Sequence, residues 1–188
     1  IHFAEGDPFN DQDISKVNTR LRNLNFFKKI DINTNKLDEN DYLVNIDVDE
    51  QPTGDFQIGV TFGTIEGATL ITELNEKNIA GTGRDLSFVI NTSENKSKYK
   101  LSSNEPFAFN RPIDLLYGVE FNEQDLSSSS SYNVETLILD SGINFDISNK
   151  IKYGFNINYE LKDYTITDSS TASSSIINSS GKNTYINF

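Results

Sequence analysis

From Gly54 onward, the sequence consists of segments of about ten residues in which apolar and polar side chains alternate. A period of two is typical of a β-strand, because successive side chains point to opposite faces of a sheet. The clearest segment sets Ile151, Tyr153, Phe155, Ile157, Tyr159 and Leu161 against Lys152, Gly154, Asn156, Asn158 and Glu160. Seven such segments follow one another, and an eighth begins near Lys182. This part of the chain is therefore restricted to an antiparallel sheet of long strands.

A transmembrane β-barrel explains this pattern better than a soluble sheet protein does. The segments match the roughly 9–11 residues that a tilted strand needs to cross a bilayer. Their polar positions hold charged residues, amides and glycine, as a water-filled lumen requires. Tight turns, as at residues 148–150, alternate with long serine-rich loops at residues 123–131 and 168–180. A soluble antiparallel sandwich or barrel is the alternative, because it also alternates.

The first 52 residues carry a different pattern and predict an α+β unit. Apolar side chains recur there at helical spacing: Ile14, Val17, Leu21 and Leu24. Asn10 is a candidate N-cap for this helix, and Asn25 is a candidate left-handed C-cap. Residues 28–34 and 42–48 alternate and predict two strands joined by a polar turn. The unit is too short to be self-sufficient, so we expect its first elements to lie upstream.

Composition excludes several classes of function. The 188 residues include 16 Lys and Arg against 28 Asp and Glu, and a formal net charge of -12 repels nucleic acid. The chain has no Cys and one His, His2, which excludes thiolate metal sites and histidine-based triads. We therefore expect no enzyme activity, no catalytic residues, no metal, no cofactor and no nucleic-acid partner. The absence of Met predicts a piece cut from a longer chain.

Each group of acidic residues can be explained by a structural role as well as by a functional one. Asp47, Asp49 and Glu50 could be read as a calcium cluster, but they lie at a strand end without the usual glycine-containing loop, which favours solvated surface. Four acids lie within the alternating segments: Glu73, Asp85, Glu120 and Glu160. Paired glycosidase carboxylates are one interpretation of these. Charge facing a lumen is the simpler one, and it is what we expect.

Five motifs, in their order along the chain, resemble the Omp85 superfamily. They are residues 6–10 (GDPFN), 20–30 (RLRNLNFFKKI), 51–54 (QPTG), 78–83 (NIAGTG) and 104–107 (NEPF). Two departures from the family pattern occur. Asn25 stands where the family usually has glycine, and both residues accept a positive φ. Glu105 is an insertion relative to the family motif.

The resemblance implies a fold and a location. Residues 1–52 are expected to form the C-terminal part of a periplasmic POTRA domain, similar to the fifth repeat. Residues 53–188 are expected to form the N-terminal half of an antiparallel transmembrane β-barrel, truncated to about eight of sixteen strands. The protein is then expected in the outer membrane of a Gram-negative bacterium.

The resemblance also implies a function that uses no cofactor. The implied function is the folding and insertion of β-barrel proteins by strand pairing at a lateral gate. Its implied partners are unfolded outer-membrane protein clients, accessory assembly lipoproteins and membrane lipid. The implied client-pairing edge is Asp55, Phe56, Gln57, Ile58, Gly59, Val60, Thr61, Phe62 and Gly63. The implied hinge between POTRA unit and barrel is Gln51, Pro52, Thr53 and Gly54. Gly59 and Gly63 either weaken packing at a seam or relieve crowding at the wall.

Two other functions remain open at the level of sequence. One is a different Omp85 transporter, either TamA-like or a two-partner secretion pore that exports a polypeptide through the lumen. The other is a soluble β-rich adhesin module. The number of upstream POTRA repeats would separate the first from an assembly factor, and folding without detergent would indicate the second.

Overall fold

The chain divides into two compact units. A computed structural model describes residues 6–39, 41–64, 66–148 and 151–188. Unit 1 comprises Ile1–Thr53, and unit 2 comprises Gly54–Phe188.

Unit 1 contains one helix and one hairpin. Helix α1 (Asp11–Leu24) begins after Asn10, whose side chain accepts a hydrogen bond from the backbone N–H of Gln12 at 3.0 Å. It ends at Asn25, which has φ 57° and donates its N–H to the carbonyl of Arg22. Strands β1 (Phe27–Lys36) and β2 (Tyr42–Glu50) pair antiparallel. The predicted helix, both of its caps and the two strands are all present.

The interior of unit 1 lies between α1 and β1. Val17 on the helix and Ile30 on the strand are its buried apolar side chains in the described part of the unit. The rings of Phe9 and Tyr42 stack 4.1 Å apart and fix the segment before the helix to β2. This core is small, since a helix and a two-stranded sheet bury little apolar surface.

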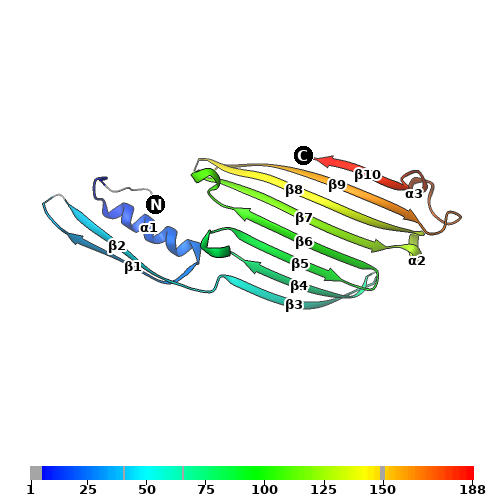
Figure 1. The fold of residues 1–188 in the computed structure, drawn as a ribbon, viewed down its shortest axis with the longest axis horizontal. Helices are drawn as coiled ribbons and strands as arrows, with labels where there is room; N and C mark the ends of the chain where they lie inside the picture. Colours follow the sequence, from blue (N-terminus) through cyan, green and yellow to red (C-terminus); the bar gives the residue numbers. More distant parts are fainter. Residues whose placement is uncertain (1–5, 40, 65, 149–150) are drawn as a thin grey trace. The chain divides into compact units, whose positions relative to one another are not determined.

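Unit 2 is a single antiparallel sheet of eight strands (Figure 1). The strands are β3 (Gly54–Gly63), β4 (Gly67–Glu76), β5 (Asp85–Thr92), β6 (Lys96–Glu105), β7 (Ile113–Asp125), β8 (Tyr132–Ser148), β9 (Ile151–Ile166) and β10 (Gly181–Asn187). Each strand pairs with its neighbour in sequence, so the sheet is a meander. Among the described residues β3 and β10 pair on one side only, and the sheet is not closed into a barrel.

The connections lie at two ends of the sheet. The proximal end, where the chain enters at Gly54, holds residues 77–84 with η1 (Ile79–Gly81) and residues 106–112 with η2 (Ala108–Asn110). The distal end holds residues 64–66, 93–95, 126–131 and 167–180, and the last two of these contain the short helices α2 (Ser127–Ser130) and α3 (Ser174–Asn178). The predicted tight turn at 148–150 has residues 149 and 150 outside the described ranges.

One predicted loop is wrong in its first part. Residues 123–131 were expected to form a loop, but β7 continues to Asp125, which pairs with Asn133. The polar residues of this stretch face Glu135 and Val134 across an intact ladder. The strand therefore extends past its apolar region, and polar side chains there do not indicate a loop.

The two faces of unit 2 differ in two adjacent rows of residues that run across all of its strands. One cross-strand row carries an apolar side chain on every strand: Phe56, Leu74, Phe88, Leu101, Val119, Leu139, Tyr159 and Ile186. The adjacent row on the opposite face is polar or glycine throughout: Asp55, Asn75, Ser87, Ser102, Gly118, Asp140, Asn158 and Asn187. The sheet is thus sided across all of its strands.

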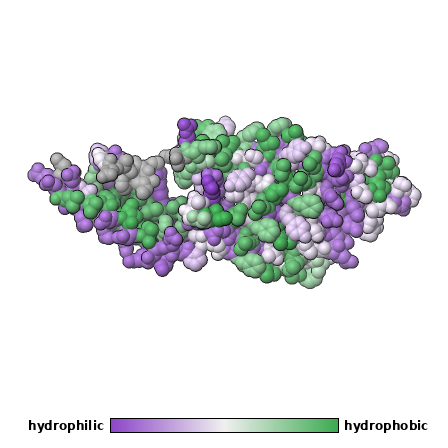
Figure 2. Space-filling model, in the orientation of Figure 1, coloured by the Kyte–Doolittle hydropathy of each residue, from purple (hydrophilic) through white to green (hydrophobic). Residues whose placement is uncertain are grey.

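No second layer covers the apolar face within the described residues. Phe56 is 60% exposed and Leu139 is 46% exposed, and the buried apolar residue of unit 2 is Ala108, which lies in a turn. Figure 2 shows exposed hydrophobic residues on the surface of the sheet, interspersed with hydrophilic ones. A soluble sandwich would bury these side chains against a second sheet. An exposed apolar face opposite a polar one is the arrangement expected of a barrel wall between lipid and water.

Candidate functional site

All nine residues of the implied client-pairing edge lie on β3, which among the described residues pairs with β4 and with no other strand. Every residue of this strand is exposed. In an antiparallel ladder every second residue directs its N–H and C=O away from its partner strand. The outer side of β3 therefore presents a row of backbone donors and acceptors that another strand could use.

The side chains of β3 follow the two faces of the sheet. Phe56, Ile58, Val60 and Phe62 belong to the apolar face and are 57–82% exposed. On the polar face, Asp55 accepts hydrogen bonds from the amides of Gln57 at 3.0 Å and Asn75 at 3.2 Å. The bond from Asn75 ties the start of β3 to β4, and the outer edge of β3 stays open.

The glycines of β3 stand in open surroundings. A Cβ added to Gly59 would meet no atom within 4 Å, and at Gly63 the nearest atom is the backbone nitrogen of Glu66 at 3.9 Å. By contrast, a Cβ at Gly142 would overlap the side chain of Asn156. Relief of crowding therefore explains Gly142 and does not explain Gly59 among the described residues. That Gly59 weakens a seam stays a prediction.

The implied hinge begins at a residue fixed to unit 1. The backbone N–H of Gln51 donates to the carbonyl of Phe26 at 2.9 Å, and its side-chain amide donates to the carbonyl of Asn25 at 2.8 Å. Pro52 and Thr53 follow, and Gly54 is the first residue of β3. The boundary between the two units lies between Thr53 and Gly54. Movement at this boundary stays a prediction.

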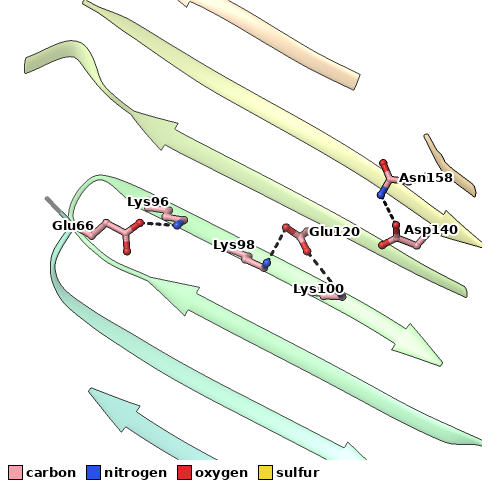
Figure 3. A network of polar contacts seen from close by, with 7 residues as sticks. All are labelled: Glu66, Lys96, Lys98, Lys100, Glu120, Asp140 and Asn158. Carbon is pink, nitrogen blue, oxygen red and sulfur yellow. Dashed lines mark hydrogen bonds and ion pairs between the residues drawn. The ribbon is translucent and has the colours of Figure 1, made fainter. Parts of the chain in front are cut away.

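The polar face carries a charge cluster centred on Glu120 (Figure 3). Lys98 lies 2.9 Å from one carboxylate oxygen of Glu120, and Lys100 lies 3.8 Å from the other. The side chain of Glu120 is only 11% exposed. Its partners come from the neighbouring strand, so the cluster joins β6 to β7. A carboxylate this buried requires such compensation. Glu120 therefore has a structural role on the polar face, where two lysines balance its charge. That this face lines a lumen stays a prediction.

A hollow of about 730 Å³ lies on the same face of unit 2. Its floor includes small side chains from neighbouring strands, such as Ser87, Ser102 and Gly118. At one side Asp140 accepts a hydrogen bond from Asn158 at 2.5 Å (Figure 3). The hollow exists because glycine and serine occupy positions where larger residues would fill the space. Sequence alternation marks these positions as polar but does not reveal that they adjoin.

The described residues contain neither a cluster that could hold a metal ion nor a helix that could cross a membrane. They contain no group of three or more His, Asp or Glu side chains that could hold a metal ion. None of the helices in the described part of the chain is long and apolar enough to cross a membrane.

Comparisons with known proteins match both units. Residues 78–188 match the family model described as the Omp85 superfamily domain. Residues 1–51 match POTRA, described as the surface antigen variable number repeat. The outer membrane protein assembly factor BamA of Buchnera aphidicola subsp. Acyrthosiphon pisum (strain APS) is 28% identical over 171 residues, which are 87% of this chain and 25% of that protein.

A solved structure has the same fold. It is the crystal structure of BamA from Haemophilus ducreyi lacking POTRA domains 1–3, with a TM-score of 0.75 and 18% identity. The similarity covers 88% of this chain and 32% of the other, so this chain spans about a third of the solved chain and a quarter of the curated relative. Because the Omp85 model matches more than half of the sequence and a POTRA match precedes it, this chain belongs to the Omp85 superfamily.

Proposed function

We propose that the full-length protein folds β-barrel proteins and inserts them into the outer membrane of a Gram-negative bacterium. Unit 2 lies in the membrane in this proposal, and unit 1 lies in the periplasm. Family membership supports it, as does the similarity to two proteins named BamA, one of them described as an outer membrane protein assembly factor. The sided sheet supports the membrane location, because one face is apolar on all eight strands.

The open edge of β3 carries the mechanistic part of the proposal. An unfolded client binds by adding a strand to β3, and its backbone satisfies the donors and acceptors that β4 leaves unused. The bonds are backbone bonds, so clients of different sequence can pair at the same edge. This step requires no nucleotide and no metal. Unit 1 recruits clients and accessory assembly lipoproteins, and residues 51–54 set its angle to the membrane part.

Site-directed crosslinking of the full-length protein tests the proposed edge. Single cysteines placed along residues 55–63 should form adducts with a nascent barrel client. Matched cysteines along residues 151–161 provide the control, because β9 is paired on both sides, with β8 and β10. Adducts no more frequent on β3 than on β9 would remove the gate assignment.

Export of a polypeptide through the lumen is a second candidate, favoured by the polar hollow. The same experiment separates the two functions when a cysteine is added at Ser102, on the floor of the hollow. A secretion pore predicts that the passing polypeptide crosslinks to Ser102→Cys and not to residues 56–63 of β3, since only Asp55 of the edge lines the hollow. An assembly factor predicts the reverse.

A further inference from the structure

The turn that joins β6 to β7, residues 106–112, exposes two phenyl rings. Phe107 is 64% exposed and Phe109 is 77% exposed, whereas Ala108 between them is 2% exposed. Two large aromatic side chains exposed in one tight turn are unfavourable in water. Their exposure indicates that an apolar partner or medium covers this part of the surface.

The backbone of this turn is strained in order to hold the rings outward. Phe107 has φ 56° and Phe109 has φ 58°, both in the left-handed region that bulky residues avoid. The conformation is held by a bond from the N–H of Arg111 to the carbonyl of Ala108 at 3.1 Å. Strain of this kind persists only where the surroundings impose it, and it is often found at functional sites.

A second turn supports the first. Arg84, which ends the neighbouring connection at residues 77–84, lies 2.7 Å from a carboxylate oxygen of Glu105, the last residue of β6. This ion pair joins the connection at residues 77–84 to the end of β6, from which the strained turn begins. The turn that carries the phenyl rings therefore begins at a strand end that an ion pair holds in place.

The apolar face of the sheet reaches this end of unit 2. Ile113, which begins β7, lies opposite Phe145 of β8, and Phe145 lies opposite Tyr153 of β9. The last two rings stack with centroids 6.2 Å apart. All three side chains belong to the apolar face, which on β7 begins at Ile113, the first residue of the strand after the turn that carries the exposed phenyl rings. Arg111, exposed between the rings and this strand, adds a cation.

We propose that Phe107 and Phe109 bind the boundary between acyl chains and headgroups of the periplasmic leaflet, with Arg111 facing the lipid phosphates. This inference rests on the membrane location proposed above. Aromatic side chains at the end of an apolar face, next to a cation, match the chemistry of a lipid interface. The turn thereby fixes the depth of the proximal end of β6 and β7 in the bilayer.

Nitroxide labels test the depth of the turn in the full-length protein, reconstituted in vesicles of phosphatidylethanolamine and phosphatidylglycerol. Single cysteines replace Phe107 or Phe109, and heat-dependent migration on a gel confirms that each variant is folded. Collisions of the label with oxygen and with a water-soluble nickel chelate are then compared. Ser129→Cys in a distal connection serves as the aqueous control, and Val119→Cys on the apolar face serves as the lipid control.

A lipid anchor predicts an oxygen-to-nickel ratio at positions 107 and 109 several-fold above that of Ser129→Cys and below that of Val119→Cys. A ratio equal to that of Ser129→Cys would overturn the inference, because the rings would then lie in water. Low access to both reagents would also overturn it and would indicate a protein partner. An aqueous ratio at Val119→Cys itself would defeat the membrane location, which distinguishes failure of the proposed function from failure of the anchor.

Discussion

At the scale of single residues, Glu120 shows how charge is accommodated on the polar face. Its carboxylate is nearly buried and has an ammonium group on each side. The cluster is built across two strands, so it depends on the register of β6 against β7. Alternation in the sequence predicted that Glu120 faces the interior of the barrel. Its partners could not be predicted, because register is not readable from one strand.

Glu120→Gln is expected to destabilise the folded protein by about 2 kcal/mol, because it leaves two partly buried ammonium groups without their counter-charge. Glu135→Gln is the matched control, since Glu135 is exposed. The measurement is the urea midpoint of unfolding for both variants in lipid vesicles. Equal midpoints for the two variants would show that the cluster contributes nothing to stability.

The stability of the distal connection at residues 167–180 is expected to depend on pH through Asp168. The hydroxyl of Ser170 donates to its carboxylate at 2.7 Å and the N–H of Ser170 donates at 2.9 Å, which holds the pKa of Asp168 below its usual value. A lowered pKa in the folded state means that the stabilisation is present above the ordinary pKa of Asp. It is lost as pH falls through the lowered pKa.

The expected result is a loosening of this connection in acid. A nitroxide on Ser175→Cys should show a narrower spectrum below the usual pKa range of Asp, and Asp168→Asn should abolish that change with pH. A line shape that changes equally in both proteins would assign the effect to another group.

At the scale of elements, the open edge of β3 makes a prediction about backbone N–H groups. Along this strand they point alternately toward β4 and away from it. Of Val60→Pro and Thr61→Pro, one removes a bond of the β3–β4 ladder and should reduce folding. The other removes a donor from the free edge and should leave folding intact while reducing client assembly.

The assay is insertion of a barrel client into vesicles, with folding of each variant followed by its migration on a gel. Similar losses of folding in both variants would mean that both sides of β3 are paired in the full-length protein. That outcome would contradict an edge available to clients.

The strands of unit 2 were predictable and the connections were less so. Every strand within the described residues begins or ends close to its predicted position, because alternation is strong wherever one face is apolar. The end of β7 was missed because Glu123 and Asp125 lie beyond the apolar region, where both faces of the sheet are polar. The strained turn at Phe107 could not be predicted from the sequence, because no sequence pattern indicates a positive φ at a phenylalanine.

The candidate site was likewise predictable from the sequence only in part. The nine residues of the client-pairing edge could be placed on one strand from alternation and the family resemblance. That the strand is an edge in the described part of the chain is a property of topology and required the structure. The hollow on the polar face likewise depends on which small residues adjoin across strands.

At the scale of the whole molecule, the sided sheet predicts behaviour in water. Residues 54–188 expressed alone should aggregate without detergent, because the apolar face and the outer sides of β3 and β10 are all exposed. Size-exclusion chromatography with and without detergent measures this. A monodisperse monomer in buffer alone would favour the soluble adhesin.

The two adjoining rows, one apolar and one polar on all eight strands, restrict how this sheet can change its length over evolution. Gaining a single residue in the middle of a strand would turn every later side chain of that strand to the wrong side. Residues inserted within a strand are therefore expected to come in even numbers among relatives, or in an odd number only where a β-bulge absorbs the extra residue. The connections are free of this rule and can vary by any number of residues.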